Sequence, residues 1–275
     1  SGKALALMEQ YEKRVEEDKM RVIIGVILLA GILFANISEA VETKIVVRAK
    51  SRDAKFIGSS MGGAKVVIKD GDTGDVIKEG LTIGGTGDTK KLILDPIKRG
   101  SQLSDPSAAK FETSIDIEEP RLITIEVYAP NSQRQSMTKS STQVWLIPGK
   151  DLIGDGITVE IPGFAVDIVM PQIPEGIKLA GGKALIPIKA NIVMMCGCPT
   201  EPGGLWDSNK YEIKAIIKYD GKITGTMPLK YANKKSTFEA ELEVSHAGLY
   251  EIIVYSYDPA TGNTGLDKSV VSVSE

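Results

Sequence analysis

The segment YEIKAIIKYDGKITGTMPL, residues 211–229, decides the fold class. In its first half, apolar side chains alternate with Glu212, Lys214 and Lys218, which is the period of a β-strand with one buried face. Asp220-Gly221 then supplies a two-residue turn, because glycine adopts positive φ without steric cost. The segment therefore predicts two antiparallel strands joined by a tight hairpin turn.

The same alternation continues on both sides of this hairpin. Between residues 238 and 244, for example, every second side chain is apolar and the three between them are glutamates. Seven such runs follow one another at the spacing of a β-sandwich. They are Phe164–Met170, Ala184–Cys196, Tyr211–Tyr219, Lys222–Leu229, Phe238–Val244, Leu249–Tyr257 and Leu266–Val273. Residues 163–275 are therefore predicted to form one antiparallel sandwich.

Two motifs in this half resemble the immunoglobulin-like fold. SHAGLY, residues 245–250, resembles the tyrosine corner at the start of the sixth strand, and SYDPATGNTG, residues 256–265, resembles the ending of Ig-like bacterial and archaeal surface repeats. Ile252 stands where antibody domains carry a core cysteine. The resemblance implies a sandwich held together by packing, and it implies no particular ligand.

The preceding region, residues 41–162, is predicted to be a first β-sandwich. Apolar and polar residues alternate in 64–69, 111–117 and 123–127, and glycine-rich turns separate these runs. AKVVIKDGDTGDVIKEGLTIGG, residues 64–85, resembles the strand-turn-strand of carboxypeptidase-regulatory-like and transthyretin-like modules. That resemblance implies a structural or adhesive sandwich without catalysis. The fold class is thus mainly β, with two tandem antiparallel sandwiches.

An N-terminal hydrophobic helix is predicted before the sandwiches. The run VIIGVILLAGILFA, residues 22–35, would span about 21 Å as a helix, which is short of a bilayer core of about 30 Å. Its length and the small residues near Ala40 favour a signal peptide over 20–40. A signal peptide rarely follows a charged helical leader such as residues 1–19. The alternative is therefore a membrane anchor, which would contact the membrane through residues 20–40. Both interpretations place residue 41 onward outside the cytoplasm, either secreted or anchored at the cell surface.

The charged and chemically reactive residues argue against catalysis and against nucleic acid. The chain has 33 Lys and Arg against 36 Asp and Glu, so it offers no cationic field for a phosphate backbone. It has one histidine, His246, and two cysteines. We therefore predict a non-enzymatic structural or binding protein without a cofactor, which binds a protein partner or self-assembles, in part through its strand edges.

The stretch Met194-Met195-Cys196-Gly197-Cys198 carries the most reactive chemistry in the chain. Thiolate and thioether ligands suit Cu(I), so Met194, Cys196 and Cys198 are candidates for a soft-metal (copper) or redox site. Strand alternation offers a structural alternative, because Met194 and Cys196 share the buried face of their strand. A disulfide formed in an oxidising compartment is a further structural interpretation.

Two other groups of residues are candidate sites. Trp206 and Asp207, with Asp258 and Asn263 from the loop after the sixth strand, fall at one end of the predicted second sandwich and could bind a ligand or a partner. Alternatively, Trp206 covers its own long loop. Asp70, Asp72 and Asp75 could bind calcium, although their spacing departs from the EF-hand loop and also suits simple turn chemistry.

Overall fold

The computed structural model describes residues 2–33, 39–172 and 175–275. It divides into two compact units, Ser1–Ala40 and Val41–Glu275. In the first unit, α1 (Gly2–Leu33) is a 32-residue helix. The predicted signal or anchor segment includes residues 34–38, which lie outside the described residues. Within the described residues, no helix is both long enough and apolar enough to cross a membrane.

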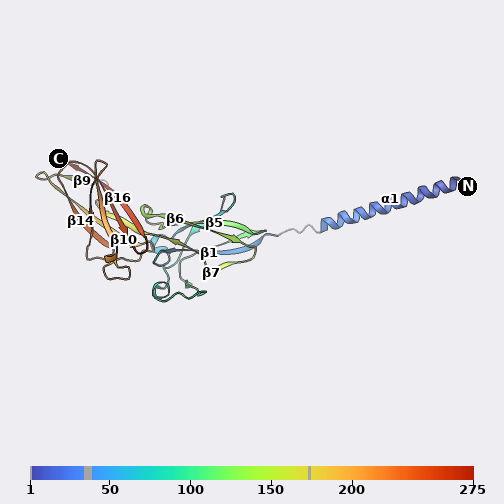
Figure 1. The fold of residues 1–275 in the computed structure, drawn as a ribbon, viewed down its shortest axis with the longest axis horizontal. Coiled ribbons are helices and arrows are strands. Elements are labelled where there is room, and N and C mark those ends of the chain that lie inside the picture. The colour runs from blue at the N-terminus through green and yellow to red at the C-terminus, as the bar shows by residue number, and fades with distance from the viewer. Residues whose placement is uncertain (1, 34–38, 173–174) are drawn as a thin grey trace. The chain divides into compact units, whose positions relative to one another are not determined.

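The first sandwich consists of two sheets (Figure 1). One has the strand order β4-β1-β7, and β1 pairs with β4 in antiparallel and with β7 in parallel orientation. The other is antiparallel, with the order β3-β2-β5-β6. The strands are β1 (Val41–Ser51), β2 (Lys65–Asp70), β3 (Val76–Leu81), β4 (Phe111–Ile117), β5 (Arg121–Ala129), β6 (Thr138–Leu146) and β7 (Leu152–Ile161).

The second sandwich contains the sheets β13-β14-β10-β8 and β12-β11-β15-β16-β9. Its strands are β8 (Phe164–Met170), β9 (Glu175–Lys178), β10 (Ala184–Met194), β11 (Glu212–Tyr219), β12 (Lys222–Pro228), β13 (Lys230–Tyr231), β14 (Thr237–Val244), β15 (Gly248–Tyr257) and β16 (Thr264–Ser274). Seven of these correspond to the predicted runs, so the predicted fold class is confirmed. Asp220 and Gly221 both have positive φ, 45° and 82°, as a type I′ hairpin requires.

The predicted tyrosine corner is present. Tyr250 is buried at the start of β15, and its hydroxyl donates a hydrogen bond to the carbonyl oxygen of His246 at 3.0 Å. This bond closes the turn that leads from β14 into β15, as the corner does in Ig-like folds. The hydroxyl of Tyr219 on the adjacent strand β11 donates to the carbonyl oxygen of Ala247 at 2.8 Å and fixes the same turn.

One continuous cluster of buried apolar side chains runs through both sandwiches. It includes Ile45 and Ile68 of the first sandwich and Ile188 and Val254 of the second. Where the sandwiches meet, Ala54, Met61, Met195 and Trp206 belong to this same cluster. Because buried apolar side chains of both sandwiches belong to one contiguous cluster, the sandwiches share one hydrophobic core.

Candidate functional site

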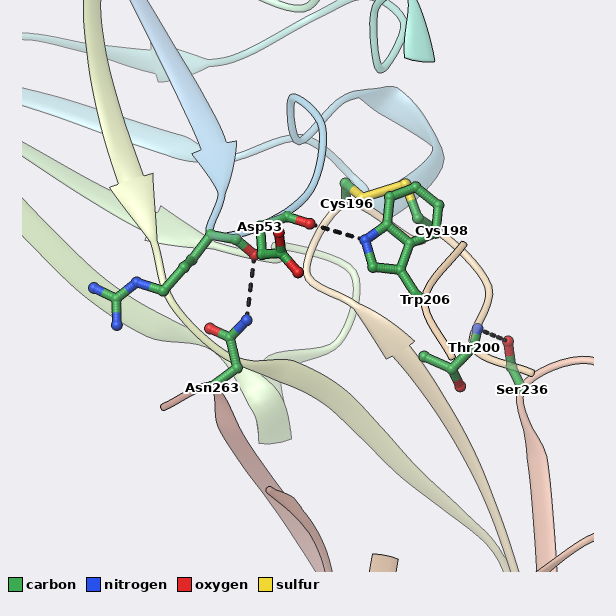
Figure 2. The surroundings of a disulfide bond; sticks show 8 residues. Asp53, Cys196, Cys198, Thr200, Trp206, Ser236 and Asn263 are labelled. Atoms are coloured by element: carbon green, nitrogen blue, oxygen red, sulfur yellow. Dashed lines mark hydrogen bonds between the residues drawn. A yellow bond between two sulfur atoms is a disulfide. The ribbon is translucent and has the colours of Figure 1, made fainter. Parts of the chain in front are cut away.

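The candidate cysteines lie at the end of β10, in a turn closed by a disulfide between Cys196 and Cys198 (Figure 2). The Gly197 amide donates to the carbonyl oxygen of Met194 at 2.7 Å, and the Met194 amide donates to that of Cys198 at 3.0 Å. Both cysteines are buried. Because the two sulfur atoms are bonded to each other, neither is a thiolate in this structure. A copper or redox role of Met194, Cys196 and Cys198 stays a prediction.

The tip of this disulfide turn packs against the first sandwich. Gly197 has a φ of +80°, which favours glycine, and an added Cβ at this position would lie 2.8 Å from the sulfur of Met61. Met61 ends η1 (Ser59–Met61), a short 3₁₀ helix in the loop between β1 and β2. A side chain at position 197 would therefore require Met61 to shift and would be strained by the positive φ.

Trp206 lies beside the disulfide, in the long connection between β10 and β11 (Figure 2). It is 7% exposed, and its indole Nε1 donates to the carbonyl oxygen of Asp53 at 2.9 Å. Asp53 has a left-handed backbone conformation, with φ of 55°, in the turn that follows β1. This turn directs the carbonyl oxygen of Asp53 toward the second sandwich, where Trp206 binds it. Trp206 therefore covers its own loop and also contacts the first sandwich.

Asn263 makes a second polar bridge to the same turn, as Figure 2 shows. Its side chain is fully buried; its Nδ2 donates to the carbonyl oxygen of Arg52 at 3.3 Å, and its Oδ1 accepts from the Gly163 amide at 2.8 Å. Gly163 lies between β7 and β8, where the chain passes from one sandwich to the other. One amide side chain thus ties together the turn after β1, the linker and the loop between β15 and β16.

The two candidate aspartates stabilise the loops that carry these residues. Asp207 accepts from the amides of Gly203 and Asn209 at 2.8 and 3.0 Å and caps η4 (Ser208–Lys210). Asp258 accepts from the Ala260 amide at 2.9 Å and from the hydroxyl of Thr261 at 2.6 Å. The structure therefore brings Trp206 and Asn263 together at one turn and gives both aspartates a supporting role in the flanking loops.

A third point of contact involves residues that the sequence patterns did not indicate. The hydroxyl of Ser136 donates to the carbonyl oxygen of Val166 at 2.8 Å and accepts from its amide at 2.9 Å. Ser136 ends η3 (Arg134–Ser136) of the first sandwich, and Val166 belongs to β8 of the second. We call the whole contact the module junction: Arg52, Asp53, Met61 and Ser136 facing Gly163, Val166, Gly197, Trp206 and Asn263.

The module junction contains acidic groups in an apolar setting. Burial raises the pKa of the Asp53 carboxyl, and the nearby Asp258 raises it further. Burial also raises the pKa of Tyr211, with Asp258 and Asp53 adding to the effect. Among the described residues, no three His, Cys, Asp or Glu side chains are grouped so that they could hold a metal ion.

His246 lies away from the module junction, in the tyrosine corner. Its Nδ1 is 3.1 Å from the hydroxyl of the adjacent Ser245, and both residues are exposed. Within the described part of the chain, no carboxylate is bonded to its ring.

The three candidate calcium residues lie at the end of β2 and in the turn that leads to β3. Asp70 Oδ1 accepts from the amides of Asp72 and Thr73 at 2.9 and 2.7 Å, and its Oδ2 binds Arg121 Nε at 2.5 Å. The hydrogen bond from the Thr73 amide is the main cause, and the contact with Arg121 the second cause, of a pKa of Asp70 that is lowered to about 2. Asp75 accepts from the Thr73 hydroxyl at 2.9 Å. A calcium ion would have to compete with Arg121 and the two amides for Asp70.

Comparisons with known proteins give structural matches but no sequence match. No protein-family model matches the chain, and no curated protein matches its sequence. Among solved structures, the fibronectin(III)-like modules of Clostridium thermocellum CbhA match with 14% identity and a TM-score of 0.26, covering 84% of this chain and 92% of that one. The assignment to β-sandwich modules rests on the four sheets and the tyrosine corner described above.

Proposed function

We propose that this chain is a non-enzymatic, extracytoplasmic protein whose two sandwiches form one rigid structural or binding subunit. It would serve at the cell surface, in a filament or as an accessory subunit of a membrane complex. One observation carries this proposal: the indole, amide and disulfide that are the best candidates for a binding site are bonded to or packed against the other half of the same chain. Side chains used in this way hold a scaffold together.

Two features support the location and the mode of partner binding. Disulfides persist in oxidising compartments, and Cys196 and Cys198 are paired. The outer strands β3 and β12 each pair with a single neighbour in their sheets, so each offers a free edge to which a partner could add a strand. Both features suit an exported subunit that assembles with other proteins.

Thiol labelling in the native host tests the compartment. Cells are quenched with acid and denatured, and the chain is treated with a maleimide polymer before and after reduction. We expect no mobility shift before reduction and a shift by two labels after it, because both cysteines are disulfide-bonded. Cys198→Ser is the matched control, since it leaves Cys196 free to take one label without reduction. Labelling of the wild type before reduction would contradict the proposed location.

Chemical cross-linking of the same cells tests the assembly. We expect the full chain to appear in a species larger than the monomer, either with itself or with an envelope protein. A chain that stays monomeric in cells and binds no envelope component after purification would overturn the structural or binding role. This outcome is independent of the labelling result, so the two parts of the proposal are tested separately.

A further inference from the structure

A long loop, residues 82–110, connects β3 to β4 on the first sandwich. Its two ends are joined, because Ile83 and Lys110 exchange backbone hydrogen bonds of 3.0 and 3.1 Å. The Gly85 amide adds a bond of 2.8 Å to the carbonyl oxygen of Ser107. The loop therefore leaves the sandwich through a closed neck.

The base of this loop is fixed to the sheet β4-β1-β7. Asp155 of β7 accepts from the amides of Leu103 and Ser104, both at 2.7 Å. Arg48 of β1 is buried, and it donates to the carbonyl oxygens of Ala108 and Ala109 at 2.7 and 2.9 Å. A small apolar cluster of Phe56, Leu92 and Ala108, with Ile93 and Leu103 packed against it, fills the base. The base of the loop is consequently held against the sheet.

The tip of the loop, residues 94–99, presents apolar side chains to solvent. Residues 94–102 are all exposed, and Leu94 and Ile97 have exposed fractions of 61% and 62%. Leu92 and Ile93 just before the tip are directed into the small cluster at the base, whereas Leu94 and Ile97 are left uncovered. An exposed apolar patch rimmed by polar residues is typical of a protein or membrane contact surface.

Cationic side chains flank these two aliphatic residues. Residues 90–99 contain Lys90, Lys91, Lys98 and Arg99 against one carboxylate, Asp95, although the chain as a whole has a formal net charge of -3. Lys90 Nζ lies 3.7 Å from Asp95, and Lys91 Nζ donates to the carbonyl oxygen of Ser104 at 3.5 Å. Lys98 and Arg99 have no ion-pair partner in the described part of the chain. The tip is thus a local positive site with two unpaired cations.

We propose that this tip docks on an anionic lipid surface. Leu94 and Ile97 enter the boundary between headgroups and acyl chains, and Lys98 and Arg99 bind lipid phosphates. A lipid surface fits the tip better than a protein does. A protein would need a pocket shaped for the two aliphatic side chains, whereas a bilayer offers an apolar layer directly beneath its negatively charged headgroups. This contact goes beyond the proposed function, since it assigns a membrane-binding site to the first sandwich.

Vesicle sedimentation tests this assignment. The unit Val41–Glu275, which is compact and contains the shared core, is mixed with vesicles of phosphatidylcholine alone or of phosphatidylcholine with phosphatidylglycerol. We expect binding to the anionic vesicles only, and weaker binding at high salt because salt screens exposed charges. Lys98→Gln with Arg99→Gln is expected to weaken binding about 30-fold, and Leu94→Asn with Ile97→Asn at least about tenfold.

The hairpin between β11 and β12 provides a matched control. Lys222 and Ile223 are exposed there, Ile223 at 67%, so Lys222→Gln with Ile223→Asn removes one cation and one exposed aliphatic side chain elsewhere. This control is expected to bind anionic vesicles as the wild type does. Equal losses in the control and tip variants would overturn the proposal. An absence of vesicle binding, as a tip that docks on protein would give, would overturn it too.

Discussion

Replacing Trp206 by alanine is expected to lower the free energy of unfolding by about 3–5 kcal/mol, the usual cost of removing a buried tryptophan. The indole is 7% exposed, belongs to the shared core and donates to the carbonyl oxygen of Asp53 at 2.9 Å. Chemical denaturation of Val41–Glu275 followed by far-UV circular dichroism measures the loss. Trp206→Phe retains most of the packing but leaves the Asp53 carbonyl without its donor, so it should cost less than the alanine variant, about 1–3 kcal/mol.

The second tryptophan of the chain is the control. Trp145 lies on the outer strand β6 and is 61% exposed, so Trp145→Ala is expected to change the stability by less than about 0.5 kcal/mol. If Trp206→Ala were as mild as Trp145→Ala, the indole would contribute nothing to the module junction, and the account of this site would be wrong.

Replacing Asn263 by alanine is expected to cost about 2 kcal/mol or more. The change leaves two backbone groups without their partner, the Gly163 amide and the Arg52 carbonyl oxygen, and each unsatisfied buried group costs about 1–3 kcal/mol. In a Trp145→Phe background, Trp206 fluorescence reports on the module junction directly. We expect the variant to lose Trp206 burial at lower denaturant concentration than the parent.

An exposed asparagine gives the comparison for this variant. Asn209 lies in η4 close to Trp206 but is exposed, so Asn209→Ala is expected to shift the transition by less than about 0.5 kcal/mol. Similar shifts for the two variants would show that Asn263 does not bridge the sandwiches. The two hydrogen bonds of Asn263 predict that only the Asn263 variant has a large loss of stability.

The strands that could be predicted from the sequence are those with one buried face. β11 and β14 show this alternation, and both were predicted. β1 is different, because five successive residues, Ile45–Ala49, are buried, so its interior shows no period of two. Arg48, on the second face of this strand, is covered by the loop of residues 82–110, whose contacts cannot be read from local sequence. β9 was also missed, since its four residues pair in parallel with the distant end of β16.

The structure places two of the candidate residues close together, but their contacts with the first sandwich could not be predicted from the sequence. The sequence patterns group Trp206 with Asn263 at one end of the second sandwich, and both residues lie at the module junction. Their role as a ligand or partner site stays a prediction. The same patterns could not identify Arg52 and Asp53, because these residues contribute backbone carbonyl oxygens, which every residue has. The contact of Gly197 with Met61 was also hidden, since a glycine required by a close approach looks the same in sequence as one required by a turn.

Calorimetry of Val41–Glu275 tests most directly the claim that the two sandwiches form one unit. A shared core and three polar contacts at the module junction predict a single unfolding transition whose calorimetric and van't Hoff enthalpies agree. Two resolved transitions, each with an enthalpy appropriate to one sandwich, would show that the halves unfold independently and would contradict the account.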